Sequence, residues 1–119
     1  MARPTLYGIA HCDTVKRARA WLEGQGVDFD FHDFKKAGVP LSGLERWLGA
    51  VGWEPLLNRR GTTWRRLDEA RRNAVRDAAS ARALMLDQPS VIKRPVVQWP
   101  DGCITVGFDA ADWARRIKA

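Results

Sequence analysis

The sequence has few cysteines and no long apolar run, and each lack excludes a class of protein. Its two cysteines, Cys12 and Cys103, lie far apart and form no CxxC pair, which excludes a disulfide-stapled scaffold and favours reduced thiols. No apolar run approaches the roughly 18 residues of a transmembrane helix. The first twelve residues carry a charge but no apolar core or cleavage site of a secretion signal. We therefore expect a cytoplasmic chain without a membrane partner.

Internal repeats, linkers and metal-ligand spacing are also missing. Cys12 and the two histidines do not have the spacing of a zinc site, so we expect no metal and no bound cofactor. A chain of 119 residues has the size of one domain. We predict a single domain over residues 1–119.

Charge is unevenly distributed along the chain. The formal net charge is +6, and residues 59–82 hold eight arginines against Asp68, Glu69 and Asp77, a local balance of +5. Such a stretch can attract an acidic protein, a small anion or nucleic acid. The spacing of opposite charges favours a solvated helical face. Nucleic acid is disfavoured because no helix-turn-helix, zinc finger or aromatic platform is visible.

The first third of the chain has the pattern of a β-α-β unit. Residues 5–9 are a short apolar run typical of a buried strand. Residues 13–26 have apolar side chains at helical spacing, and the two glycines at positions 24 and 26 are expected to end this helix. Residues 27–34, VDFDFHDF, alternate apolar and polar side chains as a strand with one buried face does. We expect the two strands to be parallel.

The remainder predicts several helices and then a hairpin. KKAGVP is expected to be a loop before an amphipathic helix over residues 41–51. Thr62 or Thr63 is expected to cap a short helix through Leu67. The other predicted elements are a helical region over residues 68–87 broken near 77–80, strands over 94–99 and 103–108, and a closing helix capped by Asp109 with Trp113 and Ile117 facing inward.

This element order defines the predicted fold class. A β-α-β half followed by a β-β-α half is the thioredoxin-like order, an α/β fold. About fifty mostly helical residues, approximately 40–88, separate the two halves. The sequence therefore predicts a thioredoxin-like domain with a helical insertion.

Cys12 stands where a strand gives way to a helix. A thiol at a helix N-terminus lies among unpaired N–H groups at the positive end of the helix dipole, so its thiolate is favoured. Lys16, in the first turn, adds positive charge and is a candidate for substrate binding. The same N–H groups can hold an oxyanion. Cys12 is therefore the candidate nucleophile, against the simpler interpretation of a small apolar turn residue; neighbouring His11 is a weaker candidate base.

Arg94-Pro95 forms the second candidate site. In a thioredoxin-like order, the proline that opens the third strand faces the helix that follows the cysteine, often through a cis bond. Arg94 would then direct its guanidinium at the thiolate or at a bound oxyanion. Arg59 and Arg60, before GTTW, can supply further cations to a substrate, or form a surface pair. Cys103 is expected to be a buried strand residue rather than a resolving thiol.

Four separated motifs resemble one known family. YGIAHCDTVKRARAWL, FHDFKKAG, LLNRRGTTWRRL and SVIKRPVV, in this order, are similar to the ArsC/Spx family and specifically to its YffB-like branch. The resemblance covers nearly the whole chain and implies a thioredoxin-like fold with a helical insertion. It also implies one of two activities. Enzymes of this family reduce arsenate or disulfides with one cysteine and glutathione, whereas Spx members bind the RNA polymerase α subunit.

The resemblance assigns roles residue by residue. It places the nucleophile on Cys12 and the oxyanion-binding arginine on Arg94. A second family arginine aligns near Asn58, beside Arg59 and Arg60, and a third near Phe108, where no cation stands. The cysteine loop reads GIAHCDTVK instead of the HNPxCGTSR of arsenate reductases. The CxxC of Spx redox sensors is absent as well.

The leading functional hypothesis is a single-cysteine, glutathione-dependent thiol–disulfide reductase. Glutathione is the expected reductant, the substrate is a small disulfide or an oxyanion, and glutaredoxin is a possible partner in turnover. One alternative is a Spx-like regulator that binds RNA polymerase or another acidic protein. Arsenate reduction is the other.

Overall fold

The structure is a computed structural model that describes residues 3–118. The chain divides into two compact units, one formed by residues 1–37 with 94–119 and the other by residues 38–93. In the sequence, the second unit is one continuous segment that separates the two parts of the first, as expected of an insertion. The prediction of a single domain stays a prediction.

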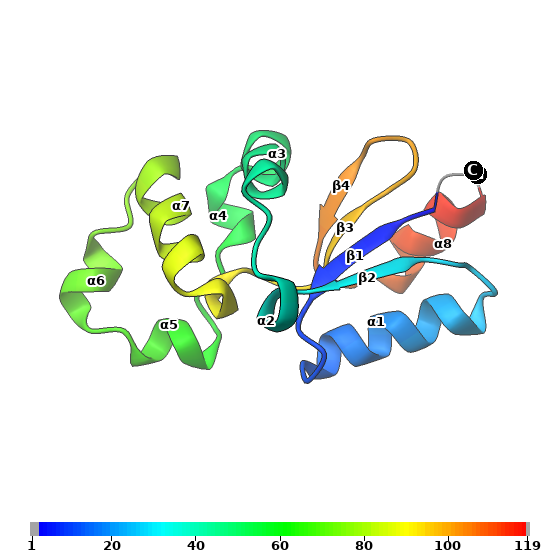
Figure 1. The fold of residues 1–119 in the computed structure, drawn as a ribbon, viewed down its shortest axis with the longest axis horizontal. Coiled ribbons are helices and arrows are strands. Elements are labelled where there is room, and N and C mark those ends of the chain that lie inside the picture. Colours follow the sequence, from blue (N-terminus) through cyan, green and yellow to red (C-terminus); the bar gives the residue numbers. More distant parts are fainter. Residues whose placement is uncertain (1–2, 119) are drawn as a thin grey trace. The chain divides into compact units, whose positions relative to one another are not determined.

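The first unit is built on a four-stranded sheet in the order β2-β1-β3-β4 (Figure 1). Strand β1 (Thr5–Gly8) pairs in parallel with β2 (Asp30–Asp33) and antiparallel with β3 (Val96–Gln98). Strand β4 (Ile104–Val106) completes the β3-β4 hairpin. Helix α1 (Asp13–Gly24) connects β1 to β2, and α8 (Ala110–Lys118) follows β4. This arrangement is the predicted thioredoxin-like α/β fold.

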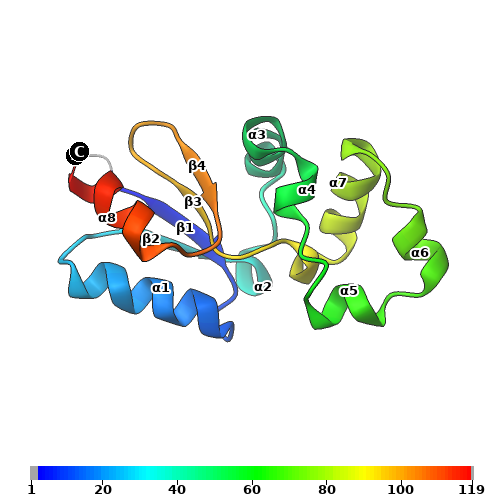
Figure 2. The same ribbon diagram turned by 180° about the vertical axis from the view of Figure 1, so that it is seen from behind.

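Both α1 and α8 cover the same face of the sheet (Figure 2). The core there joins strand residues to one side of each helix, and its fully or nearly fully buried members are Leu6, Val15, Ala18, Leu22, Val97, Trp99 and Trp113. The α1 members recur every three or four residues, which places them on one side of the helix. Packing of this apolar side fixes how α1 lies against β1.

A Schellman motif ends α1. Gly26 has φ +71°, and its N–H donates to the Glu23 carbonyl over 3.0 Å. The N–H of Val27 donates to the Leu22 carbonyl, also over 3.0 Å. A residue without Cβ adopts this left-handed conformation without steric cost, so glycine stops the helix here. The predicted closure of α1 near Gly26 is confirmed to within two residues.

Two predictions about short segments of this unit were wrong. The segment after β2 was expected to be a loop, but Phe34–Ala37 forms one helical turn, α2, started by the Asp33 carboxylate, which accepts from the Lys35 N–H over 2.9 Å. The strand predicted over 27–34 is shorter than expected, because only Asp30–Asp33 pairs with β1. Val27 and Phe29 pack instead against the core as partly buried side chains.

The second unit is helical, with helices α3 (Leu41–Val51), α4 (Trp53–Leu56), α5 (Thr62–Arg66), α6 (Glu69–Asn73) and α7 (Ala78–Asp87), followed by a 3-10 turn over Pro89–Val91. Helix α7 lies against α3 and α4. The fully buried side chains of these helices include Leu44, Trp47, Leu56 and Met85. The apolar spacing over 41–51 predicted α3 with its correct bounds.

Helix capping explains where the predictions for this unit succeeded and failed. The region 68–87 is broken as predicted, because the carboxylate of Asp68 caps α6 and that of Asp77 forms a capping box with Ser80 at the start of α7. The predicted threonine cap of α5 was wrong, since Gly61 occupies the N-cap position without a side-chain hydrogen bond. Helix α4 was not predicted at all.

None of the helices within residues 3–118 combines the length and the apolar character needed to span a bilayer.

Candidate functional site

Cys12 occupies the N-cap position of α1. After β1 ends at Gly8, the chain makes a tight turn in which the Cys12 N–H donates to the Ile9 carbonyl over 3.1 Å. The Cys12 backbone is extended, with φ −75° and ψ 125°, and its carbonyl accepts the first helical hydrogen bond from Lys16 over 2.9 Å. The side chain is partly buried against the core shared by α1 and α8. The thiol is thus held in a fixed position while remaining accessible.

Neighbouring N–H groups and a guanidinium favour the thiolate form of Cys12. Partial burial raises the pKa of the thiol. The N–H of Val15, a smaller contribution from the N–H of Thr14, and the guanidinium of Arg94 act in the other direction and prevail, so the pKa of Cys12 lies below its ordinary value. The N–H groups of Val15 and Thr14 favour the thiolate because their partial positive charges face the sulfur at the start of the helix. This direction is the one predicted from the position of the cysteine.

The register of the sheet brings Arg94 to Cys12. Tyr7 in β1 pairs with Val96 in β3, so the antiparallel pairing places the residues before Val96 beside the end of β1, where the cysteine loop begins. From there the guanidinium of Arg94 comes near enough to the Cys12 sulfur to lower the pKa of the thiol. The Arg94-Pro95 peptide bond is cis, and the Pro95 carbonyl accepts from the Gly107 N–H over 2.9 Å. Pro95 itself is buried.

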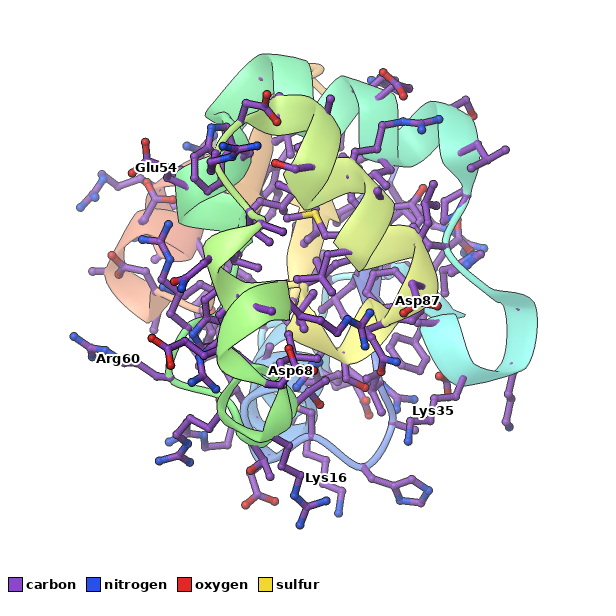
Figure 3. The ribbon with its side chains drawn as sticks, turned by 90° about the vertical axis from the view of Figure 1, so that its left-hand side faces the viewer. Lys16, Lys35, Glu54, Arg60, Asp68 and Asp87 are labelled. Atoms are coloured by element: carbon purple, nitrogen blue, oxygen red, sulfur yellow. The ribbon has the colours of Figure 1, made fainter. Side chains whose placement is uncertain are left out.

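Each of the other predicted site residues is described by its own surroundings. Lys16 is exposed, and its side chain extends away from the ribbon (Figure 3). His11 is exposed in the turn. Arg59 and Arg60 belong to the second unit; the guanidinium carbon of Arg59 lies 5.5 Å from the Trp53 ring centroid, and Arg60 points outward (Figure 3). Their proposed role in substrate binding stays a prediction.

Cys103 is exposed, which contradicts its expected burial in a strand. It stands in the turn of the β3-β4 hairpin, where its carbonyl accepts from the Trp99 N–H over 2.8 Å and its own N–H donates to Asp101. Strand β4 starts only at Ile104, and the turn places Cys103 at the opposite end of β3 from Arg94-Pro95. The sequence pattern predicted a strand from residue 103 and did not show that β4 begins at Ile104.

Phe108 stands where the family resemblance leads one to expect an arginine. Its ring packs against those of Trp113 and Trp21, with centroid distances of 4.8 and 6.1 Å. The position is therefore part of an aromatic cluster in the first unit. Among the described residues of the first unit, Arg94 is the cation that lowers the pKa of Cys12.

No group of three or more histidine, cysteine, aspartate or glutamate side chains is gathered as metal ligands within residues 3–118. Cys12 is the candidate reactive group of this site, because its thiol has a lowered pKa. A thiolate beside a guanidinium can attack a sulfur or another electrophilic centre. The guanidinium stabilises the negative charge of the thiolate.

The first unit has a thioredoxin-like fold, with Cys12 at the N-terminus of its first helix and a cis peptide bond between Arg94 and Pro95. The chain belongs to the ArsC family, whose sequence profile matches residues 7–116. It is 49% identical to a solved structure named YFFB protein, with a TM-score of 0.88 and coverage of 95% of this chain and 97% of that one. These findings place it in the YffB-like branch.

Two further relatives support the assignment. The solution structure of an arsenate reductase (ArsC) related protein from Brucella melitensis is 52% identical, has a TM-score of 0.75, and covers 99% of this chain and 97% of its own. A Haemophilus influenzae protein described as uncharacterized is 38% identical over 109 residues, which are 92% of this chain and 94% of that protein. The chain is thus a member of the ArsC family, a class of proteins similar to thiol–disulfide oxidoreductases.

Proposed function

We propose that this protein is a thiol–disulfide reductase that acts through Cys12 alone and uses glutathione as its reductant. The observation that carries the proposal is the pairing of the Cys12 thiol with both the α1 N-terminus and the Arg94 guanidinium. Both lower the pKa of the thiol, and the thiolate is the reactive form in disulfide exchange.

A first glutathione thiolate attacks the substrate disulfide, forms a mixed disulfide of substrate and glutathione, and releases one substrate thiolate. Two exchanges at Cys12 follow. The Cys12 thiolate attacks the glutathione sulfur of a mixed disulfide, forms a Cys12–glutathione disulfide, and releases the substrate thiolate, which takes a proton from water. A second glutathione thiolate then attacks the glutathione sulfur of this adduct, forming oxidised glutathione and regenerating the Cys12 thiolate. Two glutathione molecules are oxidised overall for each symmetrical disulfide reduced. Arg94 stabilises the Cys12 thiolate before the first exchange and after the second.

The need for an external thiol follows from the position of Cys103. A resolving cysteine must reach the sulfur that it attacks. Cys103 lies in the hairpin turn, whereas Cys12 lies at the other end of the paired strands β1 and β3. A small thiol such as glutathione reaches Cys12 without this restriction, and its carboxylates suit a site that contains Arg94.

Arsenate is a less suitable substrate for this site. An arsenate dianion requires several cations or N–H donors around its oxygens. The first unit offers Arg94 and the N–H groups of α1, while the third expected arginine position holds Phe108 within an aromatic cluster. The proposal therefore favours sulfur over arsenic as the centre attacked.

The test is turnover of a small disulfide, hydroxyethyl disulfide, with glutathione, coupled to glutathione reductase and read as NADPH consumption. We expect Cys12→Ser to abolish the protein-dependent rate and the matched Cys103→Ser variant to retain it. Arsenate is assayed in parallel, with and without glutaredoxin. Retained turnover in Cys12→Ser, or turnover of arsenate alone, would refute the proposal.

A second candidate function is the binding of an acidic protein by the arginines of the second unit. Arg71 pairs with Asp87 over 2.6 Å, and Arg82 pairs with Glu45. Arg60, Arg65 and Arg66 are exposed, and within residues 3–118 the structure gives them no carboxylate partner. These three side chains, which we call the arginine surface, carry an unneutralised positive charge that complements an acidic segment.

The arginine surface is testable without knowing the partner. The probe is a fluorescent poly-glutamate peptide, titrated by anisotropy at low and high salt beside a DNA duplex of equal charge. We expect salt-sensitive binding of the peptide that is lost in Arg65→Glu/Arg66→Glu and kept in Lys35→Glu/Lys36→Glu, a matched pair of exposed cations in the first unit. Equal loss in both variants, or a preference for DNA, would contradict this candidate.

A further inference from the structure

Gly8, the last residue of β1, lies directly against Val15 of α1. A Cβ built on Gly8 would stand 2.8 Å from Cγ2 and 3.3 Å from Cγ1 of Val15. Gly8 does not have a positive φ, so its backbone conformation is open to other residues. The obstacle to any larger residue here is the Val15 side chain.

Val15 cannot move out of the way without a shift of the helix. Its side chain is branched at Cβ and has one strongly preferred rotamer in a helix. It is fully buried in the core together with Leu6, Ala18 and Leu22, each of which is also fully buried. A close-packed core has no space into which the two methyl groups can turn. An added Cβ on Gly8 would therefore push the first turn of α1 away from β1.

That first turn is the part of the molecule that faces the thiol. Val15 is the third helical residue after the Cys12 cap, and its backbone N–H is the strongest of the groups that favour the thiolate. The same residue thus packs against β1 through its side chain and favours the Cys12 thiolate through its N–H. The distance between β1 and α1 therefore determines how strongly the N–H groups of the first turn of α1 stabilise the Cys12 thiolate.

We propose that Gly8 is a positioning residue for Cys12: by lacking a side chain it lets Val15 pack on β1 and so holds the N–H groups of the first turn of α1 against the sulfur. The inference rests on the proposed role of Cys12 as nucleophile. It assigns a positioning role to a residue that has no side chain of its own.

The test measures the alkylation rate of Cys12 by iodoacetamide against pH, in a Cys103→Ser background. We expect Gly8→Ala to raise the pH at which the rate reaches half its maximum, and to slow alkylation at pH 7 by about two- to fivefold, the effect of a charge at a helix end. Glutathione-dependent turnover should fall in parallel.

Two matched variants separate positioning from general destabilisation. Gly43→Ala introduces a similar close contact in α3, where a Cβ would lie 2.9 Å from Cγ of Pro40, but it is in the unit without Cys12. It should leave the pH profile of alkylation unchanged whatever it does to the melting temperature. The double variant Gly8→Ala/Val15→Ala removes the opposing methyl groups, and we expect it to restore much of the original pH profile despite its smaller core.

The outcomes distinguish this inference from the proposed function. A wild-type profile no different from that of N-acetylcysteine would remove the basis of the proposed function itself. A wild-type profile shifted to lower pH, but unchanged in folded Gly8→Ala, would refute the positioning role alone. If Gly8→Ala fails to fold, the double variant decides, because its pH profile should lie close to that of wild type. A profile shifted upward in the double variant would also refute the role.

Discussion

The guanidinium of Arg94 lies near enough to Cys12 to lower the pKa of its thiol, although the two residues come from opposite parts of the chain. The contact exists because β3 pairs antiparallel with β1 and carries Arg94 just before its first residue. The inserted helical unit separates Arg94 from Cys12 in the sequence, whereas the pairing of β3 with β1 brings the two residues close in space.

Removing the Arg94 charge should make Cys12 less reactive near neutral pH. The pKa of the thiol is held below its ordinary value partly by this guanidinium, so Arg94→Ala should raise it. We expect alkylation at pH 7 to slow by about three- to tenfold, and the difference to shrink at high salt. Lys16→Ala is the matched control, because an exposed lysine contributes little. An equal effect of the two variants would mean that general charge, rather than the contact, controls the thiol.

The Cys12 thiolate should also stabilise the folded protein at alkaline pH. Since the pKa is lower in the folded than in the unfolded chain, the contribution is fully present above the ordinary thiol pKa and is lost as the pH falls through the folded value. The melting temperature of wild type relative to Cys12→Ser should therefore increase as the pH rises through this window. Thermal unfolding followed by circular dichroism at a series of pH values measures it. A constant or decreasing difference would contradict the assigned direction.

Trp113 should be the most damaging large side chain to remove from the first unit. It is 1% exposed, and its ring lies within 4.8 to 6.1 Å of those of Phe108, Trp99 and Trp21. We expect Trp113→Ala to lower the free energy of unfolding by about 3–5 kcal/mol, measured by urea denaturation. Leu41→Ala, at a side chain 58% exposed, should change it by less than about 0.5 kcal/mol.

The capping box of α7 should give the second unit a stability that depends on acid pH. The hydroxyl and N–H of Ser80 lower the pKa of Asp77. The contribution is therefore present above the ordinary aspartate pKa and lost as the pH falls through the folded value. Asp77→Asn retains a good N-cap without a titrating group, so its melting temperature should fall less than that of wild type between neutral and acid pH. Parallel pH curves for the two proteins would exclude this cap as the cause.

Much of the fold could be predicted from the sequence because periodicity extends over several residues. The strand patterns at β1 and in the β3-β4 hairpin, and the helical spacing of α1 and α3, each repeat often enough to be recognised. Helices α2 and α4 have four residues each, about one turn, so no period can be read in them. The exposure of Cys103 depends on where pairing in the hairpin begins, which is decided by contacts between strands.

The candidate site was accessible from sequence only in part. The position of Cys12 before a helix predicts its pKa direction, because the chemistry of a helix N-terminus is local. The contact with Arg94 depends on strand register, and the fit of Gly8 against Val15 depends on the separation of β1 and α1. A glycine at the end of an apolar strand, followed by a branched residue in the next helix, was the available signal for that fit.

The six tryptophans are divided equally between the two compact units. The first unit contains Trp21, Trp99 and Trp113, and the second contains Trp47, Trp53 and Trp64. The rings of Trp99 and Trp113 meet edge to face, with centroids 5.3 Å apart, whereas Trp47 is fully buried in the other unit. Each unit thus carries an intrinsic optical reporter. Tryptophan-to-phenylalanine replacement in one unit would make the emission of the other a direct record of whether the two halves of the molecule melt together or in turn.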